Sequence, residues 1–449
     1  MLYRKAQKAI MDWIETGKDA LLVTGARQVG KTYLIQETLK ASGRDYVEFN
    51  FIRQKALIKM FDSAIDEDAE KFLTELRVAA KRDLKSNTII FFDEIQEIKE
   101  IVTIVKFLVE EGKYKYILSG SLLGVELTDL RSAPVGSMST LDMYPMDLEE
   151  FYIANGLGSE LIDNLRDCYE KHLPVSQFVH ETLIDAFYRY LIVGGMPEAV
   201  AEYVNSGDLN KVSRIHMKIY REYKRDFTKY EKEQKLRLIN TYDLIPSELN
   251  AKNKRYTFTN LDKQLKYDRY ENSFNWLIDA GVAIPVFNVT EFEIPLEASK
   301  KSNLFKLFLS DVGMLTTFYG TSTVLKLLSK EKDINCGAMF ENVVAQELNA
   351  HGFRVYYFNN KKHGEVDFLI EKDNELLPIE VKSGKDYQKH NALTYFMSTK
   401  QFNNAIVLSN YNVKENDSII YLPIYMIMFI NRNIGLDLVN KLDLSKLVG

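Results

Sequence analysis

Residues 20–32, ALLVTGARQVGKT, decide how the first part of this chain folds. The run 20–23 is short and apolar, which is typical of a buried strand. The next eight residues, 25–32, match the pattern G-x-x-x-x-G-K-[ST] at every fixed position. Residues 33–39 then follow a helical pattern. A glycine loop between a strand and a helix is the context of a phosphate-binding loop, whereas a chance glycine turn before a helix is the alternative.

The residue types in this loop suit a nucleotide phosphate. Gly25 and Gly30 allow the backbone to curl so that successive N–H groups point inward at anionic oxygens, and the N-terminus of the following helix adds to that field. Lys31 is placed to reach the β- and γ-phosphates, and the Thr32 hydroxyl to hold Mg²⁺. The expected nucleotide-binding residues of the loop are Gly25, Ala26, Arg27, Gln28, Val29, Gly30, Lys31, Thr32 and Tyr33.

The composition restricts the class of protein. A length of 449 residues predicts roughly two to four domains, and 46% hydrophobic with 27% charged residues indicates a globular chain. A net charge of −5 does not indicate a nucleic-acid binder but leaves room for a local basic groove. The cysteines are Cys168 and Cys336, too few for a disulfide framework. With no apolar signal block and no stretch long enough for a bilayer, we expect a cytoplasmic protein without membrane contact.

A second acidic site follows another buried strand. Residues 88–92, TIIFF, are β-formers without charge, as in the centre of a parallel sheet, and Asp93 and Glu94 come next. Ligands of open α/β folds bind at this carboxyl edge of the sheet. We expect Asp93 to complete the Mg²⁺ shell and Glu94 to orient and polarise the attacking water. The alternative is an acidic cap of a following helix.

The strand at residues 115–118, KYIL, ends in Ser119-Gly120-Ser121. A polar side chain there is able to sense the γ-phosphate from a neighbouring strand. Ser119 is favoured over Ser121 because it follows the strand directly, although a plain Ser-Gly turn fits nearly as well. Arg131 lies in a loop that would face another subunit or, more simply, solvent. Alternating strands and helices around this site predict a doubly wound parallel sheet with helices on both faces.

These segments together resemble a known family. GARQVGKTYLI, FFDEIQEI, ILSGS, YPMDLEEF (144–151) and VGGMPEAV (193–200) look like a large family of bacterial and archaeal AAA-type ATPases with a C-terminal region of unknown function. The resemblance implies an ATP-binding, ATP-hydrolysing domain over residues 1–152 and a homo-oligomer that completes its site in trans. No clear Gly-Arg precedes the strand before Tyr144, where relatives often carry one, so the arginine finger has no assigned residue.

The middle of the chain is predicted as a helical lid at 153–235 and a winged-helix-like domain at 236–331. The run 210–238 mixes Lys and Arg with Tyr and Phe, as nucleic-acid faces do, but its acidic residues favour a solvated amphipathic helix. The order from 236 to 292 is helix, strand, helix, helix and hairpin, the outline of a winged helix that contacts either DNA or a protein. The expected DNA face is formed by Lys252, Lys254, Arg255, Lys263, Lys266 and Arg269.

A last domain is predicted at 335–449. Its order of helix, three strands, helix and strand resembles the core of the PD-(D/E)xK nuclease fold. Asp367 and Glu380 on adjacent strands are expected to share a divalent cation, with a further contact from Glu341 on the helix. Lys382, two residues after Glu380 and so on the same strand face, would position the nucleophile. The alternative is an inactive relative in which Glu380 and Lys382 form an ion pair.

Two functions follow from these patterns. In the first, ATP with Mg²⁺ in the first domain controls a nuclease-like domain that acts on or binds DNA. In the second, the chain is a regulatory ATPase switch whose inactive nuclease-like domain binds a protein or nucleic acid. A machine that only remodels proteins is a weaker third interpretation.

Overall fold

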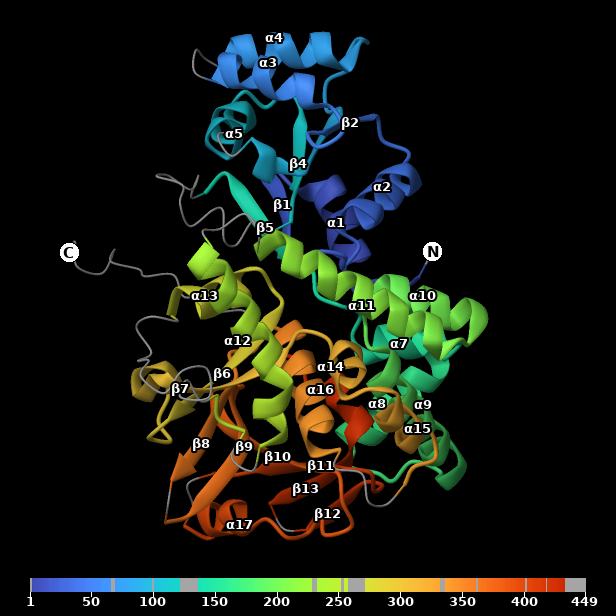
Figure 1. Ribbon diagram of the computed structural model, residues 1–449. Helices are drawn as coiled ribbons and strands as arrows, with labels where there is room; N and C mark the ends of the chain where they lie inside the picture. The colour runs from blue at the N-terminus through green and yellow to red at the C-terminus, as the bar shows by residue number, and fades with distance from the viewer. Residues whose placement is uncertain are drawn as a thin grey trace, which may run out of the picture.

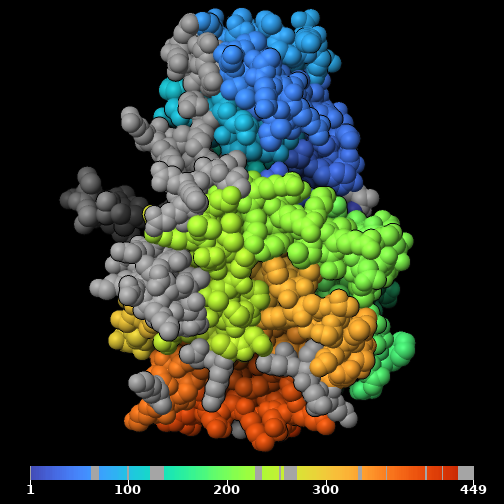
Figure 2. Space-filling model, viewed as in Figure 1, coloured from blue at the N-terminus to red at the C-terminus, as the bar shows by residue number. Residues whose placement is uncertain are grey.

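The fold is that of a computed structural model, which describes residues 2–65, 69–98, 101–121, 136–227, 232–251, 254–256, 271–331, 336–360, 362–399, 402–416 and 418–432. The chain builds two sheets, one near each end, with a band of helices between them (Figure 1). Figure 2 shows the residues of the first domain above this band and residues of the C-terminal part below it.

The first sheet contains five strands in the order β2-β3-β4-β1-β5, and every pair in it is parallel. The predicted doubly wound parallel sheet is therefore confirmed. Its strands are β1 Ala20–Thr24, β2 Tyr46–Asn50, β3 Ile89–Asp93, β4 Lys115–Ser119 and β5 Met138–Asp142.

Helices cover both faces of this sheet because alternate strand residues point to opposite sides. Leu21 and Val23 pack with α1 (Lys5–Thr16) and α2 (Lys31–Ser42) on one face. Leu22, the neighbour of both, packs on the other face. The helices on that second face are α3 Lys55–Ile65, α4 Ala69–Ala80 and α5 Ile101–Glu110.

The helical band follows the first sheet directly. The helix α7 starts in a full capping box, in which Asp147 accepts from the Glu150 backbone N–H and the Glu150 side chain accepts from Asp147. The helices α10 and α11 lie against the first domain in Figure 1. The members of the band are α7 Leu148–Ala154, α8 Ser159–Glu170, α9 Gln177–Val193, α10 Pro197–Ser206, α11 Leu209–Asp226 and α12 Lys232–Asn250.

The second sheet contains eight strands in the order β12-β13-β11-β10-β9-β8-β6-β7. The predicted order of helix, three strands, helix and strand is present as α16 (Gly337–Ala350), β8, β9, β10, α17 (Asn391–Ser398) and β11. The strands are β6 Ala283–Val289, β7 Lys300–Leu309, β8 Tyr356–Asn360, β9 Gly364–Lys372, β10 Glu375–Lys382, β11 Ala405–Ser409, β12 Lys414–Asn416 and β13 Ile419–Pro423.

The second sheet extends across the predicted boundary between 236–331 and 335–449. The β6–β7 hairpin, expected as the wing of a separate module, joins the C-terminal sheet because β6 pairs in parallel with β8. Residues 257–270, with most of the predicted recognition segment, lie outside the described residues. One cluster of buried side chains also extends from Met146 to Ile430, so the helical band and the C-terminal sheet share a core.

The remaining helices are α13 Glu271–Asp279, α14 Val312–Tyr319 and α15 Thr321–Leu328, with short 3-10 turns at Ile95–Glu97, Leu296–Ser299 and Ile424–Phe429. Among them, α14 packs against α16, which is buried along most of its length, whereas α13 packs on α12 and β6, and α15 packs on α14 and α9. None of the helices in the described residues has the length and apolar character needed to cross a membrane.

Candidate functional site

The loop between β1 and α2 has the backbone that its glycines permit. Gly25 has φ +129° and Gly30 has φ +89°, values that residues with a Cβ rarely adopt. A Cβ on Gly25 would lie 2.0 Å from the carbonyl oxygen of Met143. Lys31 folds back over the loop, and its Nζ donates to the carbonyl oxygens of Gly25 and Ala26, at 2.8 Å each.

Thr32 and Asp93 meet as the sequence predicts. The Thr32 hydroxyl donates to the Asp93 carboxylate at 3.0 Å. Asp93 also accepts from Asn50 Nδ2 at 2.7 Å. Asn50 ends β2 as Asp93 ends β3, and the two pair in the sheet register. The sequence reasoning missed Asn50, although the rule that ligands bind at the carboxyl ends of parallel strands applies to it equally.

Glu94 adopts a left-handed backbone, with φ 60°. Its carboxylate accepts from Gln96 Nε2 at 2.6 Å, and the same amide group lies 3.4 Å from Ser121 Oγ. Ser119 is fully buried, and its Oγ has no hydrogen-bond partner. Both serines line the cavity described next, so the structure does not separate the two predicted alternatives.

A cavity of about 950 Å³ joins these groups. From the loop it is lined by Arg27, Gln28, Gly30, Lys31, Thr32 and Tyr33, whereas Ala26 and Val29 are buried in the core below. Asp93 and Glu94 lie on its wall. The sequence reasoning missed the opposite wall, which is formed by the N-terminal segment and by α7 and α10, at Leu2, Tyr3, Arg4, Ile153, Ala154, Pro197, Glu198, Ala201, Val204 and Asn205.

Burial shifts the pKa values of Lys31 and Asp93, and each shift favours the neutral form of the side chain. It lowers the pKa of Lys31 to about 8, against the opposing effect of Glu94 and Asp93. Burial, reinforced by Glu94, raises the pKa of Asp93 to about 6. A bound polyphosphate would favour the charged lysine, and a bound cation would favour the charged aspartate. The site is therefore suited to receive both together.

Arg27 and Gln28 point out of the loop toward α11. Arg27 Nη1 contacts Asp226 Oδ1 at 2.8 Å, and Gln28 Nε2 donates to Glu222 Oε2 at 2.8 Å. The Tyr223 hydroxyl donates to the Arg27 carbonyl at 3.2 Å. From the sequence, the acidic residues of this helix were expected to neutralise a nucleic-acid face. In the structure, Glu222 and Asp226 contact the phosphate-binding loop. The amphipathic interpretation agrees with the burial of Val212, His216, Ile219 and Tyr223.

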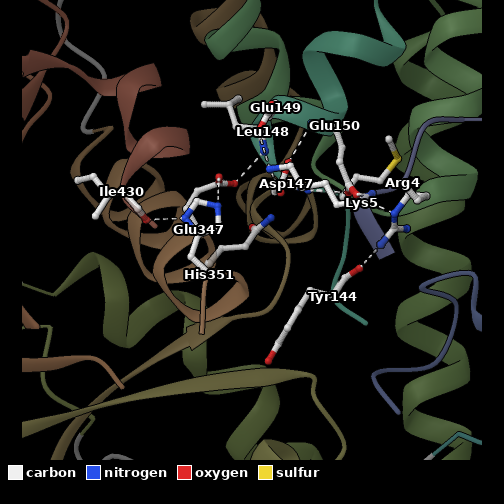
Figure 3. Close-up of polar contacts among 12 residues, drawn as sticks. Arg4, Lys5, Tyr144, Asp147, Leu148, Glu149, Glu150, Glu347, His351 and Ile430 are labelled. Atoms are coloured by element: carbon white, nitrogen blue, oxygen red, sulfur yellow. Dashed lines mark hydrogen bonds and ion pairs between the residues drawn. The ribbon is translucent and has the colours of Figure 1, made fainter. Parts of the chain in front are cut away.

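A polar network connects the first domain to the C-terminal half (Figure 3). Arg4 donates to the Val29 and Tyr144 carbonyls and pairs with Glu150 at 3.1 Å. Lys5 Nζ lies 2.7 Å from Asp147. From α16, Glu347 Oε1 accepts from the Leu148 N–H at 2.9 Å. Figure 3 shows these side chains converging from the N-terminus, the start of α7 and α16.

The C-terminal site residues are brought together in pairs. Lys382 Nζ lies 2.6 Å from Glu380 Oε1, so these side chains share a strand face as predicted and form the ion pair of the alternative interpretation. Asp367 Oδ2 accepts from the Val381 N–H at 2.9 Å. Burial, together with Glu380 and Glu341, raises the pKa of Asp367 well above its usual range. A cavity of about 540 Å³ reaches Glu380 and Lys382 from outside.

Glu341, predicted as a further metal contact, is engaged by two lysines. It pairs with Lys254 and with Lys306 Nζ, which lies at 3.5 Å. No three Asp, Glu, His or Cys side chains of the described residues are grouped to hold a metal ion. Lys254, expected on a DNA face, is thus engaged with a buried carboxylate. Other members of that face, Lys252, Lys263, Lys266 and Arg269, lie outside the described residues, as does Arg131.

Fold and site together define a P-loop nucleotide-binding domain, and the comparisons agree. Residues 17–152 match a family model described as an AAA domain. This segment of the chain is therefore similar to AAA domains. Two further models, each described as a domain of unknown function, match residues 184–325 (DUF8612) and residues 336–427 (DUF4143). No curated protein matches the chain.

Three solved structures are similar to parts of this chain. The Walker-type ATPase PABY2304 of Pyrococcus abyssi is 16% identical, with 71% of this chain and 96% of that chain covered and a TM-score of 0.42. Cdc6p from Pyrobaculum aerophilum is 13% identical, with coverages of 73% and 93% and a TM-score of 0.25. PCH-2 of C. elegans is 13% identical, with coverages of 49% and 69% and a TM-score of 0.28.

Proposed function

We propose that this protein binds ATP with Mg²⁺ in the cavity of the first domain and hydrolyses it. The observation that carries the proposal is the contact of 3.0 Å between the Thr32 hydroxyl and Asp93, in a cavity that Lys31 and Glu94 also line. The hydroxyl and the carboxylate are hard oxygen ligands, which Mg²⁺ prefers. Backbone N–H groups of the loop and the N-terminus of α2 would hold the phosphates.

Each residue has a role in this reaction. Lys31 would exchange its contacts with the Gly25 and Ala26 carbonyls for phosphate oxygens. Glu94 would orient a water whose oxygen attacks the γ-phosphorus while the bond to the β–γ bridging oxygen breaks, and the water proton passes to the carboxylate or to phosphate. Mg²⁺, when bound by Thr32 and Asp93, would neutralise charge that develops on the phosphates. Ser119, with its unpartnered hydroxyl, would contact the γ-phosphate.

The test separates binding from hydrolysis. Lys31→Ala should lose ATP binding, because the loop cation is removed. Glu94→Gln should keep binding but lose roughly 10²- to 10⁴-fold in kcat, the usual contribution of a general base. The control is Lys40→Ala, an exposed lysine of the same helix that pairs with Glu37. Steady-state ATPase rates and equilibrium binding of a fluorescent ATP analogue are the measurements, and hydrolysis that survives Lys31→Ala would refute the proposal.

A second candidate function is binding of DNA at the C-terminal sheet under the control of ATP. It is supported by three lysines, Lys362, Lys382 and Lys389, which line the second cavity together with Glu365 and Glu380. Beside them, the His363 ring stacks on Tyr395 with centroids 4.0 Å apart, and Tyr395 is 41% exposed. Cations along a groove with an accessible aromatic ring suit a single-stranded backbone and its bases.

This candidate is tested by binding and cleavage in one set of samples. A labelled single-stranded oligonucleotide and a plasmid are incubated with the protein, with and without ATP and Mg²⁺. Lys362→Ala/Lys389→Ala should weaken binding and reduce its salt dependence, because two phosphate contacts are lost. Lys171→Ala, an exposed lysine that pairs with Asp167 of α8, is the control. An unchanged affinity of Lys362→Ala/Lys389→Ala for DNA would contradict this candidate function. Cleavage by the wild type that is lost in Asp367→Ala/Lys382→Ala would show that the protein is a nuclease.

A further inference from the structure

The C-terminal carboxylates surround a lysine that the motifs do not contain. Lys306, on β7, is completely buried. Its Nζ lies 2.5 Å from Glu365 Oε1 and 3.5 Å from Glu341 Oε2. Since β7 belongs to the hairpin that joins this sheet through β6, the lysine reaches the carboxylates of α16 and β9 from within the same core.

Most oxygens of the other carboxylates in the cluster are also engaged by protein groups, whereas the buried Glu380 Oε2 has no hydrogen-bond partner. Lys254 provides a second cation to Glu341, and Lys382 pairs with Glu380 at 2.6 Å. Asp367 accepts a backbone N–H at 2.9 Å. A divalent cation such as Mg²⁺ requires near-octahedral oxygen ligands, and its binding is opposed by a buried ammonium a few ångströms away. The residues present therefore do not fit the divalent metal that the nuclease-like fold implies.

We propose that Lys306 takes the place of that metal ion: it is the fixed internal counter-ion of Glu341 and Glu365 and makes the cluster independent of divalent metal. An unpaired buried carboxylate is costly, and a buried pair persists when each charge is matched and hydrogen-bonded. The lysines that line the adjoining cavity are then left to bind phosphate without cutting it. This inference rests on the second candidate function, and it concerns none of the residues of the ATP cavity.

The first experiment measures Mn²⁺ binding to the full-length protein without nucleotide, by the loss of the free-ion signal in electron paramagnetic resonance. Wild type and Asp367→Asn/Glu380→Gln should bind the same number of Mn²⁺ ions, because those carboxylates hold none. A Mn²⁺ ion bound by the wild type and lost in this variant would overturn the proposal. DNA binding is measured separately, so failure of the inference and failure of the second candidate function remain distinguishable.

The second experiment removes the counter-ion. Lys306→Met should lower Tm, and Mn²⁺ should raise the Tm of this variant but not that of the wild type. If Lys306→Met does not fold, Lys306→Met/Glu365→Gln, which removes one unmatched carboxylate as well, should restore folding, and that rescue supports the counter-ion role. If neither variant folds, the Mn²⁺ measurement on the wild type decides. A Lys306→Met protein with unchanged Tm and no response to Mn²⁺ would contradict the proposal.

Discussion

Gly195 lies between α9 and α10, where the chain turns back toward the nucleotide cavity. The Met146 N–H donates to the Gly195 carbonyl at 2.6 Å, and the Gly195 N–H donates to Asp311 at 2.6 Å. A Cβ at this position would lie 2.0 Å from the Met146 carbonyl oxygen. The absence of a side chain thus allows the first domain's last segment, α10 and α14 to approach one another.

Replacing Gly195 should show how much this contact contributes to the stability of the protein. Gly195→Ala should reduce the free energy of unfolding by about 1–3 kcal/mol, the usual cost of overpacking, because the clash is with backbone. Gly384→Ala is the control, since nothing lies within 4 Å of a Cβ built there. Chemical denaturation of both variants is the measurement. Equal stability of the two would show that the backbone relaxes around residue 195 without cost.

At the scale of elements, α11 is the helix that contacts the phosphate-binding loop. Its last turns present Glu222, Tyr223 and Asp226 to Arg27 and Gln28. Gly281, which precedes β6, approaches the same loop, and a Cβ on it would lie 3.1 Å from the Ala26 nitrogen. The loop is thereby held by two elements that belong to the other half of the molecule.

Asp226→Asn should strengthen ATP binding and slow turnover. The change removes a negative charge beside the cavity and releases Arg27, so we expect KM for ATP to fall by up to about fivefold, equivalent to the roughly 1 kcal/mol of a partly exposed pair. The value of kcat should also fall, because the loop is less firmly positioned. Asp243→Asn is the control, since it removes a contact of 2.8 Å to Lys224 of the same helix. Identical kinetics in the two variants would mean that the Arg27 contact has no functional role.

At the scale of the whole molecule, the two halves meet at buried carboxyl groups (Figure 3). Burial, with Asp147 and Glu150 adding to it, raises the pKa of Glu347 well above its usual value, although Lys5 opposes the shift. Burial and Asp147 likewise raise the pKa of Glu150 to about 7. Burial also disfavours the charged form of His351. Because that form is the protonated one, the pKa of His351 is lowered. The junction therefore favours the neutral forms of Glu347, Glu150 and His351, beside the ion pair of Lys5 and Asp147.

This arrangement predicts how stability depends on pH. A carboxyl whose pKa is raised in the folded state keeps a proton that the unfolded chain releases, so stability falls as pH rises above the unfolded pKa. Glu347→Gln cannot ionise and escapes this penalty. Its Tm should exceed that of the wild type at about pH 8, with a difference that shrinks toward about pH 5. Glu110→Gln, exposed on α5, is the control, and a difference independent of pH would contradict the assignment.

Much of the fold was predictable because strands and helices leave local patterns. The apolar run before Gly25, the run TIIFF before Asp93 and the Glu380–Lys382 spacing each identified a strand and the side chains at its end or on its face. The division of the second half was not predictable from such patterns. The hairpin at 283–309 would show the same alternation of apolar and polar residues in a winged helix as in a larger sheet. The two cases differ in whether the hairpin pairs with a further strand, which here is β8.

Local sequence patterns were enough to predict the phosphate-binding loop, its acidic partners and the α/β class of the first domain, because those features depend on residues close together in the chain. Packing in three dimensions was needed to show that α11 contacts Arg27, that α10 lines the cavity, and that Lys306 lies among the C-terminal carboxylates. These contacts join residues separated by long stretches of chain. Burial and charge pairing select them, and both depend on how complete elements pack.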